Sequence, residues 1–119
     1  MKLEKIQIAK GTNIQYLSHE LLFLAHSGQP YRGTIYVNFT SCGETCNLLD
    51  LKKYITSLRD KKLNAEDIAY EIFTTISQSI KTKELGVIVD LTARGGIQQR
   101  ISYGTAFNTI QKENIFQVK

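Results

Sequence analysis

Residues 27–67 read SGQPYRGTIYVNFTSCGETCNLLDLKKYITSLRDKKLNAED, and this stretch decides the fold that we expect. It opens on a Gly/Pro turn at residues 28–30. Three apolar residues, Ile35, Val37 and Phe39, then alternate with polar ones. A period of two is typical of a β-strand that packs one face and exposes the other.

Two amphipathic helices are predicted after this strand, which spans residues 33–40. One helix covers residues 47–60, and the other opens at Asn64, a favoured N-cap residue. Glu66 and Asp67 follow in the first turn, where acidic side chains suit the helix dipole. The apolar positions at helical spacing are Leu48, Leu51, Tyr54, Ile55, Leu58, Ala69, Ile72, Phe73, Ile76 and Ile80.

Three further strands are predicted outside this stretch. The pattern of residues 14–25 fits a strand or a helix, and we favour a strand because the segment runs into a turn and a second strand. Residues 85–92 and 97–103 alternate like strands on either side of a glycine turn. Residues 3–9 fit a short strand or an arm, and residues 104–119 form a mixed tail.

The order ββααββ predicts an α+β fold in a single domain over residues 1–119. Two helices should cover one face of a four-stranded antiparallel sheet. The other face should carry Thr34, Tyr36, Asn38, Gln98, Arg100 and Ser102, a set too polar for a second core. Because a small sheet with two open edges tends to pair with copies of itself, we expect a closed homo-oligomer with sites between subunits.

Composition excludes several classes of function. The net charge is +4, but the basic residues are scattered, so we expect no direct binding to nucleic acid. Cys42 and Cys46 are too few for a secreted disulfide scaffold, and no histidine follows them at zinc-finger spacing, so we expect no metal. No apolar run reaches membrane-spanning length and no signal peptide opens the chain, which predicts a cytoplasmic protein.

The predicted order, with a carboxylate at the start of the second helix, resembles the tunnelling fold (T-fold), whose members form oligomeric barrels. Three motifs are more specific. GQP at residues 28–30 with GTIYV at 33–37, YITSLRD at 54–60 and TARGGI at 92–97 resemble motifs of the 7-cyano-7-deazaguanine reductase (QueF) family. The resemblance covers roughly residues 20–104. It implies a small-molecule 7-deazaguanine as the partner of this chain.

The resemblance places Glu66 on the family's base-anchoring glutamate. A guanine edge offers an N–H and an amine side by side, and one carboxylate can accept both hydrogen bonds. The ordinary alternative is an acid that only stabilises the helix N-terminus. Cys46, Asn47 and Leu48 fall where the family lines the same pocket, although the family's glutamate and serine are replaced by Asn47 and Leu48. Cys46 either touches the base or is a buried thiol.

The departures from the family matter more than the matches. The family's nucleophilic cysteine falls on Leu24 and its acidic aspartate falls on Tyr31. Leu24 cannot attack a nitrile to form a thioimide. In the family's lysine-bearing cofactor motif only Lys52 matches, because Leu49 replaces one lysine. Separately, Ala65 replaces the family's histidine before the anchoring glutamate. We therefore expect no NADPH and no other cofactor.

A carboxylate is a 7-substituent that needs no nucleophile. We therefore expect decarboxylation of 7-carboxy-7-deazaguanine to 7-deazaguanine, and the resemblance implies a branch that serves bacteriophage DNA modification in a host cytoplasm. Leu24 would give an apolar wall against the carboxylate. His26, Tyr31 and also His19 are the candidate proton donors, and Arg32 could attract the anion.

Other interpretations stay open. His26 also fits a turn residue facing water, Tyr31 fits a core or interface aromatic, and Arg32 fits a solvated charge. The chain could bind a deazapurine or pterin without reaction. It could also carry out nitrile chemistry, amidine formation or reduction, with a relocated thiol from Cys42 or Cys46.

Overall fold

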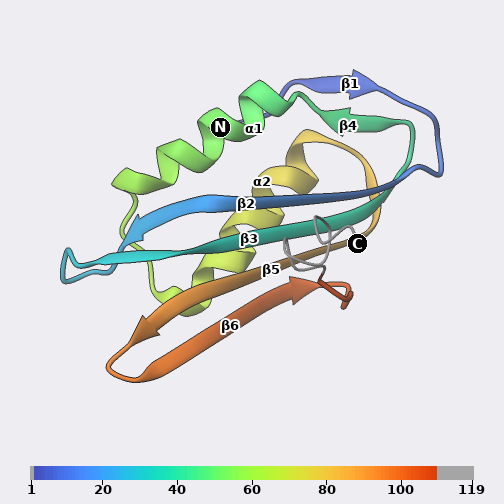
Figure 1. The fold of residues 1–119 in the computed structure, drawn as a ribbon. Helices are drawn as coiled ribbons and strands as arrows, with labels where there is room; N and C mark the ends of the chain where they lie inside the picture. The colour runs from blue at the N-terminus through green and yellow to red at the C-terminus, as the bar shows by residue number, and fades with distance from the viewer. Residues whose placement is uncertain (1, 110–119) are drawn as a thin grey trace, which may run out of the picture.

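Four long antiparallel strands form a sheet in the order β2-β3-β5-β6, and two helices lie against one of its faces (Figure 1). The computed structural model describes residues 2–109. The elements of this layer are β2 (Asn13–Leu24), β3 (Pro30–Ser41), α1 (Leu48–Ser57), α2 (Ile68–Ser79), β5 (Thr82–Arg94) and β6 (Ile97–Gly104). The predicted α+β class and the ββααββ order are confirmed.

The first hairpin resolves the ambiguity over residues 14–25 in favour of a strand. Leu24 lies opposite Pro30, and Tyr16 lies opposite Val37. The Ala25 N–H donates to the Gln29 carbonyl oxygen at 2.8 Å and closes the turn. The side chains that alternate toward the helices, Leu21 and Phe23, are buried because both helices cover that face.

A second, two-stranded sheet joins the N-terminal segment to the start of α1. It pairs β1 (Lys5–Gln7) with β4 (Glu44–Cys46) in antiparallel fashion. Residues 3–9 thus include a short strand, and its partner β4 is a strand that the sequence did not predict. A three-residue strand is too short to show alternation, and its pairing depends on residues about forty positions away.

The helix ends differ from the prediction. Asn47 caps α1, and its Oδ1 accepts from the backbone N–H groups of Leu49 at 2.9 Å and Asp50 at 3.2 Å. After α1 the chain tightens into a 3₁₀ turn, η1 (Leu58–Asp60). Another 3₁₀ turn, η2 (Ala65–Asp67), precedes α2, and the Asn64 side chain makes no capping hydrogen bond, so the prediction that Asn64 caps α2 is wrong.

The main core lies between the sheet and the helices. Phe23, Leu58, Ile68, Val87 and Val89 are wholly buried there. Leu58 belongs to η1 and Ile68 begins α2, so burial fixes both ends of the connection between the helices. Burying each such aliphatic side chain contributes about 1.5–3 kcal/mol.

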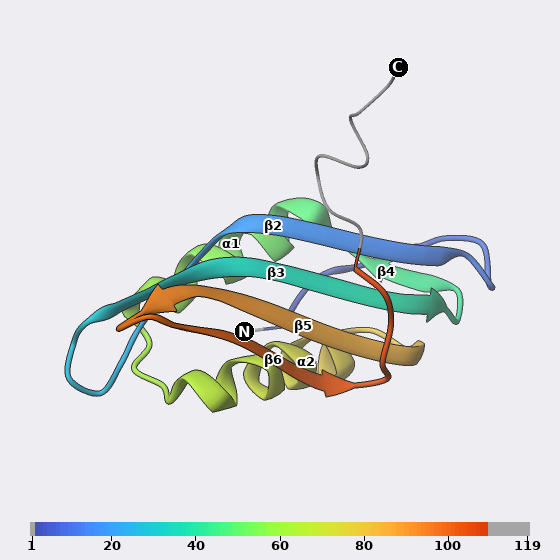
Figure 2. The ribbon, with the colours of Figure 1, turned by 60° about the horizontal axis from the view of Figure 1, so that its bottom comes forward.

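The outer face of the sheet is less polar than predicted. Tyr36 and Ile88 lie on that face and are 4% and 6% exposed. Residues 105–109 turn back across it, as Figure 2 shows. The Thr105 N–H donates to the Leu85 carbonyl oxygen at 2.9 Å, and Gln15 Nε2 donates to the Asn108 carbonyl oxygen at 3.3 Å.

Gln98, Arg100 and Ser102 on this face are exposed, which agrees with the expectation that the face is too polar for a second core, and the returning chain covers only part of it. The rest of the predicted tail, residues 110–119, lies outside the described residues. Among the residues that are described, no helix is long and apolar enough to span a membrane.

Candidate functional site

One end of the sheet brings three connections together, and we call it the turn end. It holds the β2–β3 turn at residues 25–29, the β5–β6 turn at residues 95–96, and the α1–α2 connection at residues 61–67 (Figure 1). The Leu24 N–H donates to the Lys61 carbonyl oxygen at 2.9 Å, and the Leu24 carbonyl oxygen accepts from the Leu63 N–H at 2.9 Å. The connection therefore runs along the open edge of β2.

Glu66 lies on this connection, in η2. Its side chain is exposed, and Oε2 accepts one hydrogen bond, from Gln99 Nε2 on β6, at 3.2 Å. An ionised carboxylate has room for several more donors. The position just before α2 also favours the negative charge through the helix dipole. Glu66 therefore has room to accept further hydrogen bonds, and its role as a base anchor stays a prediction.

Tyr31 lies at the start of β3 on the helix side of the sheet. It pairs with Phe23, and the two rings stack at 5.0 Å between centroids with an interplanar angle of 23°. Because Phe23 points into the core, Tyr31 shares that side. Side chains alternate along a strand, so Leu24 and Arg32 point to the opposite face. The turn end thus gathers Leu24, Tyr31 and Glu66, but it separates Leu24 and Arg32 from the side that Tyr31 occupies.

Arg94 is a residue of the turn end that sequence reasoning read only as part of a turn. Its guanidinium carbon lies 4.6 Å from the centre of the Tyr31 ring. Nη1 donates to the Pro30 carbonyl oxygen at 3.4 Å, and Nη2 donates to Gln29 Oε1. Arg94 and Gln29 belong to the TARGGI and GQP motifs, which are distant in the sequence, so no local pattern could have revealed the pair.

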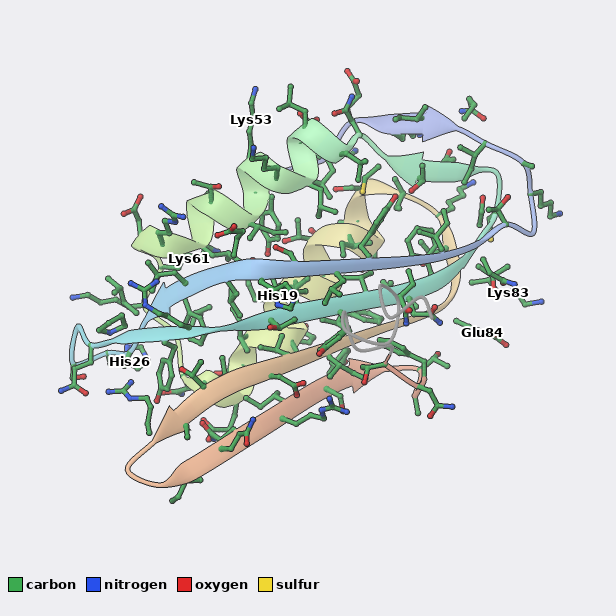
Figure 3. All side chains as sticks on the ribbon, in the orientation of Figure 1. His19, His26, Lys53, Lys61, Lys83 and Glu84 are labelled. Atoms are coloured by element: carbon green, nitrogen blue, oxygen red, sulfur yellow. The ribbon has the colours of Figure 1, made fainter. Side chains whose placement is uncertain are left out.

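The two histidines lie apart from each other (Figure 3). His26 is exposed in the β2–β3 turn, at the turn end. His19 lies in the irregular part of β2, and its Nδ1 is 2.9 Å from Thr34 Oγ1. Of the predicted proton donors, the structure therefore places His26 and Tyr31 at the turn end and His19 along the sheet.

Cys46, Asn47 and Leu48 lie away from the turn end. The preceding residue, Thr45, has its Oγ1 2.6 Å from Tyr16 Oη, and Tyr16 pairs with Val37, seven residues along β3 from Pro30. Cys46 is buried, and burial is the main reason that its pKa is raised. Asn47 is occupied as the cap of α1. One chain therefore does not bring these three residues to Glu66.

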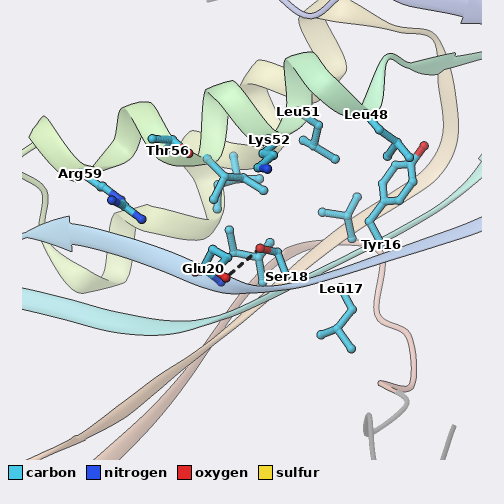
Figure 4. Close-up of a pocket in the computed structure, with 13 residues that line it drawn as sticks. Tyr16, Leu17, Ser18, Glu20, Leu48, Leu51, Lys52, Thr56 and Arg59 are labelled. Carbon is cyan, nitrogen blue, oxygen red and sulfur yellow. Dashed lines mark hydrogen bonds between the residues drawn. The ribbon is translucent and has the colours of Figure 1, made fainter. Parts of the chain in front are cut away.

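Leu48 instead borders a groove between α1 and β2 with a volume of about 290 Å³ (Figure 4). Ile35, Val37 and Ile55 form apolar walls, and Lys52 on α1 and Arg59 on η1 supply positive charge. The groove is thus an apolar recess beside the open edge of β2, with cations along the helix. Within residues 2–109 no cluster of three metal-ligating side chains occurs.

Known proteins resemble this chain in sequence. Residues 30–109 match the model of the family described as QueF-like protein. The NADPH-dependent 7-cyano-7-deazaguanine reductase of Sulfurimonas denitrificans is 34% identical over 71 residues, which cover 60% of this chain and 57% of the relative. The protein of the same name from Wolinella succinogenes is 30% identical over 82 residues, covering 69% and 66%. The chain thus spans less than two thirds of these relatives.

A solved structure supports the fold. The archaeosine synthase QueF-Like in its apo form superposes with a TM-score of 0.70 at 12% sequence identity, covering 87% of this chain and all of the other. Such a likeness concerns the arrangement of strands and helices. The sequence match over residues 30–109 goes further, since it includes Tyr31, Glu66 and Arg94 of the turn end. The chain belongs to the family of QueF-like proteins.

Proposed function

We propose that this chain removes the carboxylate of 7-carboxy-7-deazaguanine as carbon dioxide and releases 7-deazaguanine. The relatives are named for a 7-substituted 7-deazaguanine, and we extend that substrate class to this chain. One observation carries the proposal: an accessible Glu66 lies at the turn end, whereas neither cysteine of the chain lies there.

Glu66 supports the choice of a guanine-type base. Its carboxylate is held lightly by Gln99 and is open to solvent. The ring N–H and the exocyclic amine of a 7-deazaguanine can donate to its two oxygens. Hydrogen bonds to a charged group contribute about 1.5–3 kcal/mol each, so two of them would supply much of the binding energy of a small base.

The position of the thiols supports a reaction without a nucleophile. Cys42 follows the far end of β3, roughly 35 Å along the strand from the turn end, and Cys46 is buried beside Tyr16, which pairs with Val37, seven residues along β3 from Pro30. Burial raises the pKa of Cys46, which disfavours the reactive thiolate. Thioimide formation, the first step of nitrile reduction or amidine formation, thus lacks a thiolate from the same chain.

Loss of carbon dioxide needs only a proton. A donor protonates ring carbon 7, the bond to the carboxylate breaks, and its electron pair returns to the ring as carbon dioxide leaves. One proton is consumed for each carbon dioxide released. Tyr31 is the proton donor that we favour because it shares the helix side with Glu66, and His26 in the adjacent turn is the second candidate.

The test is incubation of the purified protein with 7-carboxy-7-deazaguanine in deuterated water. The expected result is release of carbon dioxide and one deuterium at carbon 7 of the product. A rate below about 1 per second would still be catalysis. A matched Cys42→Ser, Cys46→Ser double variant should keep the activity, whereas Tyr31→Phe should lower it about 10²- to 10⁴-fold. Recovery of bound but unchanged substrate would instead show a binding protein and overturn the proposal.

A further inference from the structure

Arg94 carries a positive charge at the turn end, and neither the base contact of Glu66 nor the proton transfer uses it. We propose that Arg94 binds the anionic substituent at position 7 of the base and so determines the preference of this site for a carboxylate. The inference rests on the proposed function for the identity of the ligand. It replaces Arg32, which the sequence suggested, as the residue that receives the anion.

The Arg94 guanidinium is held in a fixed place. It lies 4.6 Å above the centre of the Tyr31 ring, and Tyr31 stacks in turn on Phe23, which is wholly buried. Two neutral acceptors, the Pro30 carbonyl oxygen and Gln29 Oε1, steady its two terminal nitrogens. A guanidinium ordered by stacking loses little further freedom when it binds a ligand.

The charge of Arg94 has no carboxylate partner among residues 2–109. The ion pairs there belong to other cations, Lys5, Lys61 and Arg100. Arg100 shows the contrast, because its Nε and Nη2 donate to Asp90 at 2.6 and 2.7 Å. Arg94 has five N–H donors and only two recorded acceptors, both neutral, so it can still bind a carboxylate with two hydrogen bonds.

Arg94 also lies between the position of Glu66 at β6 and that of Tyr31 on β3, where the substituent of a bound base would point. Glu66 bonds to Gln99 on β6, Arg94 lies on the neighbouring β5, and Tyr31 lies on β3 beyond it. Gln99 pairs with Leu91, which points into the core, so these side chains share the helix side of the sheet. Two strand spacings of about 4.8 Å give roughly 10 Å from β6, whose Gln99 contacts Glu66, to β3, which carries Tyr31. A two-ring base with a substituent at position 7 can bridge that span.

Arg32 is placed differently. It follows Tyr31 directly on β3 and pairs with Leu22, so its side chain points to the outer face. A base held by Glu66 on the helix side would turn its substituent away from Arg32. If Arg94 binds the anion, Arg94→Gln should lose the preference for an anionic ligand and Arg32→Gln should keep it. If Arg32 binds the anion, the results should be reversed.

Arg94 is assigned to binding and not to the chemical step. A guanidinium paired with the carboxylate stabilises the bound substrate, and this pairing does not help the bond to carbon dioxide to break. Loss of Arg94 should therefore raise KM about 10- to 100-fold and change kcat much less. A residue needed only for folding would lower the fraction of active protein and leave KM unchanged.

The experiment compares two ligands that cannot lose carbon dioxide, neutral 7-deazaguanine and anionic 7-sulfo-7-deazaguanine, by calorimetry. The wild type should bind the sulfonate more tightly. Arg94→Gln should weaken sulfonate binding about 10- to 100-fold and leave 7-deazaguanine binding within about twofold, which also shows that the variant is folded. Arg94→Lys should restore part of the preference. Lys53→Gln, a cation-removing control on the exposed side of α1 (Figure 3), should behave like the wild type.

In the calorimetry, two outcomes would overturn the assignment: equal weakening of both ligands in Arg94→Gln, or loss of the sulfonate preference in Arg32→Gln alone. The proposed function fails separately. If the wild type prefers the sulfonate through Arg94 but never releases carbon dioxide from the carboxylate, only the decarboxylation is wrong. If it releases carbon dioxide and Arg94→Gln keeps the wild-type KM, only the assignment of Arg94 is wrong.

Discussion

At the scale of single residues, two glutamates five positions apart have contrasting surroundings. Glu66 is exposed and accepts one hydrogen bond, from Gln99. The Glu71 side chain is partly buried and accepts from Tyr54 Oη at 2.8 Å, Lys61 Nζ at 3.0 Å and Thr75 Oγ1 at 3.3 Å. A carboxylate with spare acceptor capacity suits a ligand, whereas one with its partners in place suits the architecture.

The first prediction concerns Glu66. Glu66→Gln keeps the shape of the side chain and removes the charge, so the affinity for 7-deazaguanine should fall about 10- to 100-fold by calorimetry. The free energy of unfolding should change by less than about 0.5 kcal/mol because the side chain is exposed. Asp67→Asn is the matched control, since Asp67 is an exposed acid in the same turn. Equal losses in both variants would mean that Glu66 acts only through the charge of the helix end.

The second prediction concerns Glu71. Burial raises its pKa, but hydrogen bonds from Lys61 and Tyr54 outweigh burial, so its pKa is lowered overall. The stabilisation is therefore present above the pKa of the unfolded chain, near 4.3, and is lost as pH falls through the lower folded value. Glu71→Gln should cost roughly 1–3 kcal/mol at pH 7 in urea unfolding, with a smaller difference from the wild type below about pH 4. A difference that does not vary with pH would contradict this account.

At the scale of elements, the α1–α2 connection positions Glu66 through backbone hydrogen bonds to β2. The Leu63 N–H donates to the Leu24 carbonyl oxygen, and the Lys61 carbonyl oxygen accepts from Leu24. The N–H of Lys62, between them, makes no recorded backbone bond of this kind. The adjacent residues Lys62 and Leu63 thus differ, because only the Leu63 N–H bonds the connection to β2.

The third prediction uses this difference. Leu63→Pro removes a donor, so it should lower both the free energy of unfolding and the affinity for 7-deazaguanine. Lys62→Pro, the matched variant, should have the smaller effect on both. Leu63→Ala separates the loss of the side chain from the loss of the N–H, and it should keep more affinity than Leu63→Pro. If the two proline variants bind the base equally well, the connection does not position Glu66.

How far the sequence predicted these elements depended on their length. The twelve-residue β3 and the two helices have enough periods to be recognised, and the sequence predicted them correctly. β4, with three residues, has too few periods to be recognised. The path of residues 105–109 across the outer face depends on how the chain returns after β6. Pairings between distant segments leave no local pattern to read.

The residues of the candidate site also differ in whether the sequence alone could predict them. Glu66 was predicted because the family resemblance places the base-anchoring glutamate at this position, and the structure places it at the turn end. Arg94 was overlooked because its meaning comes from Tyr31, sixty-three positions earlier, through a register that only the folded sheet defines. The opposite orientations of Leu24 and Tyr31 likewise follow from strand register and not from their positions in a motif.

At the scale of the whole molecule, the residues predicted for one pocket lie in two separate places. Glu66 lies at the turn end, while Leu48 borders the groove beside β2. In the described sheet, β2 and β6 each leave one edge unpaired. The aromatic cluster of Tyr70, Phe73 and Tyr103 lies beside β6. A head-to-tail ring of copies would place one edge against the other and could bring Leu48 of one chain to Glu66 of the next.

The last prediction tests such sharing by complementation. Glu66→Gln and Leu48→Arg should each lose binding of 7-deazaguanine, and Leu48→Arg should fold because Leu48 is 63% exposed. When the two variants are unfolded, mixed in equal amounts and refolded together, about a quarter of the interfaces in a random ring would contain both wild-type residues. Titration should therefore recover about a quarter of the wild-type binding sites at wild-type affinity. If mass spectrometry shows mixed oligomers and no sites return, Glu66 and Leu48 do not share a site across an interface. If Leu48→Arg alone binds normally, the base is held by the turn end without the groove.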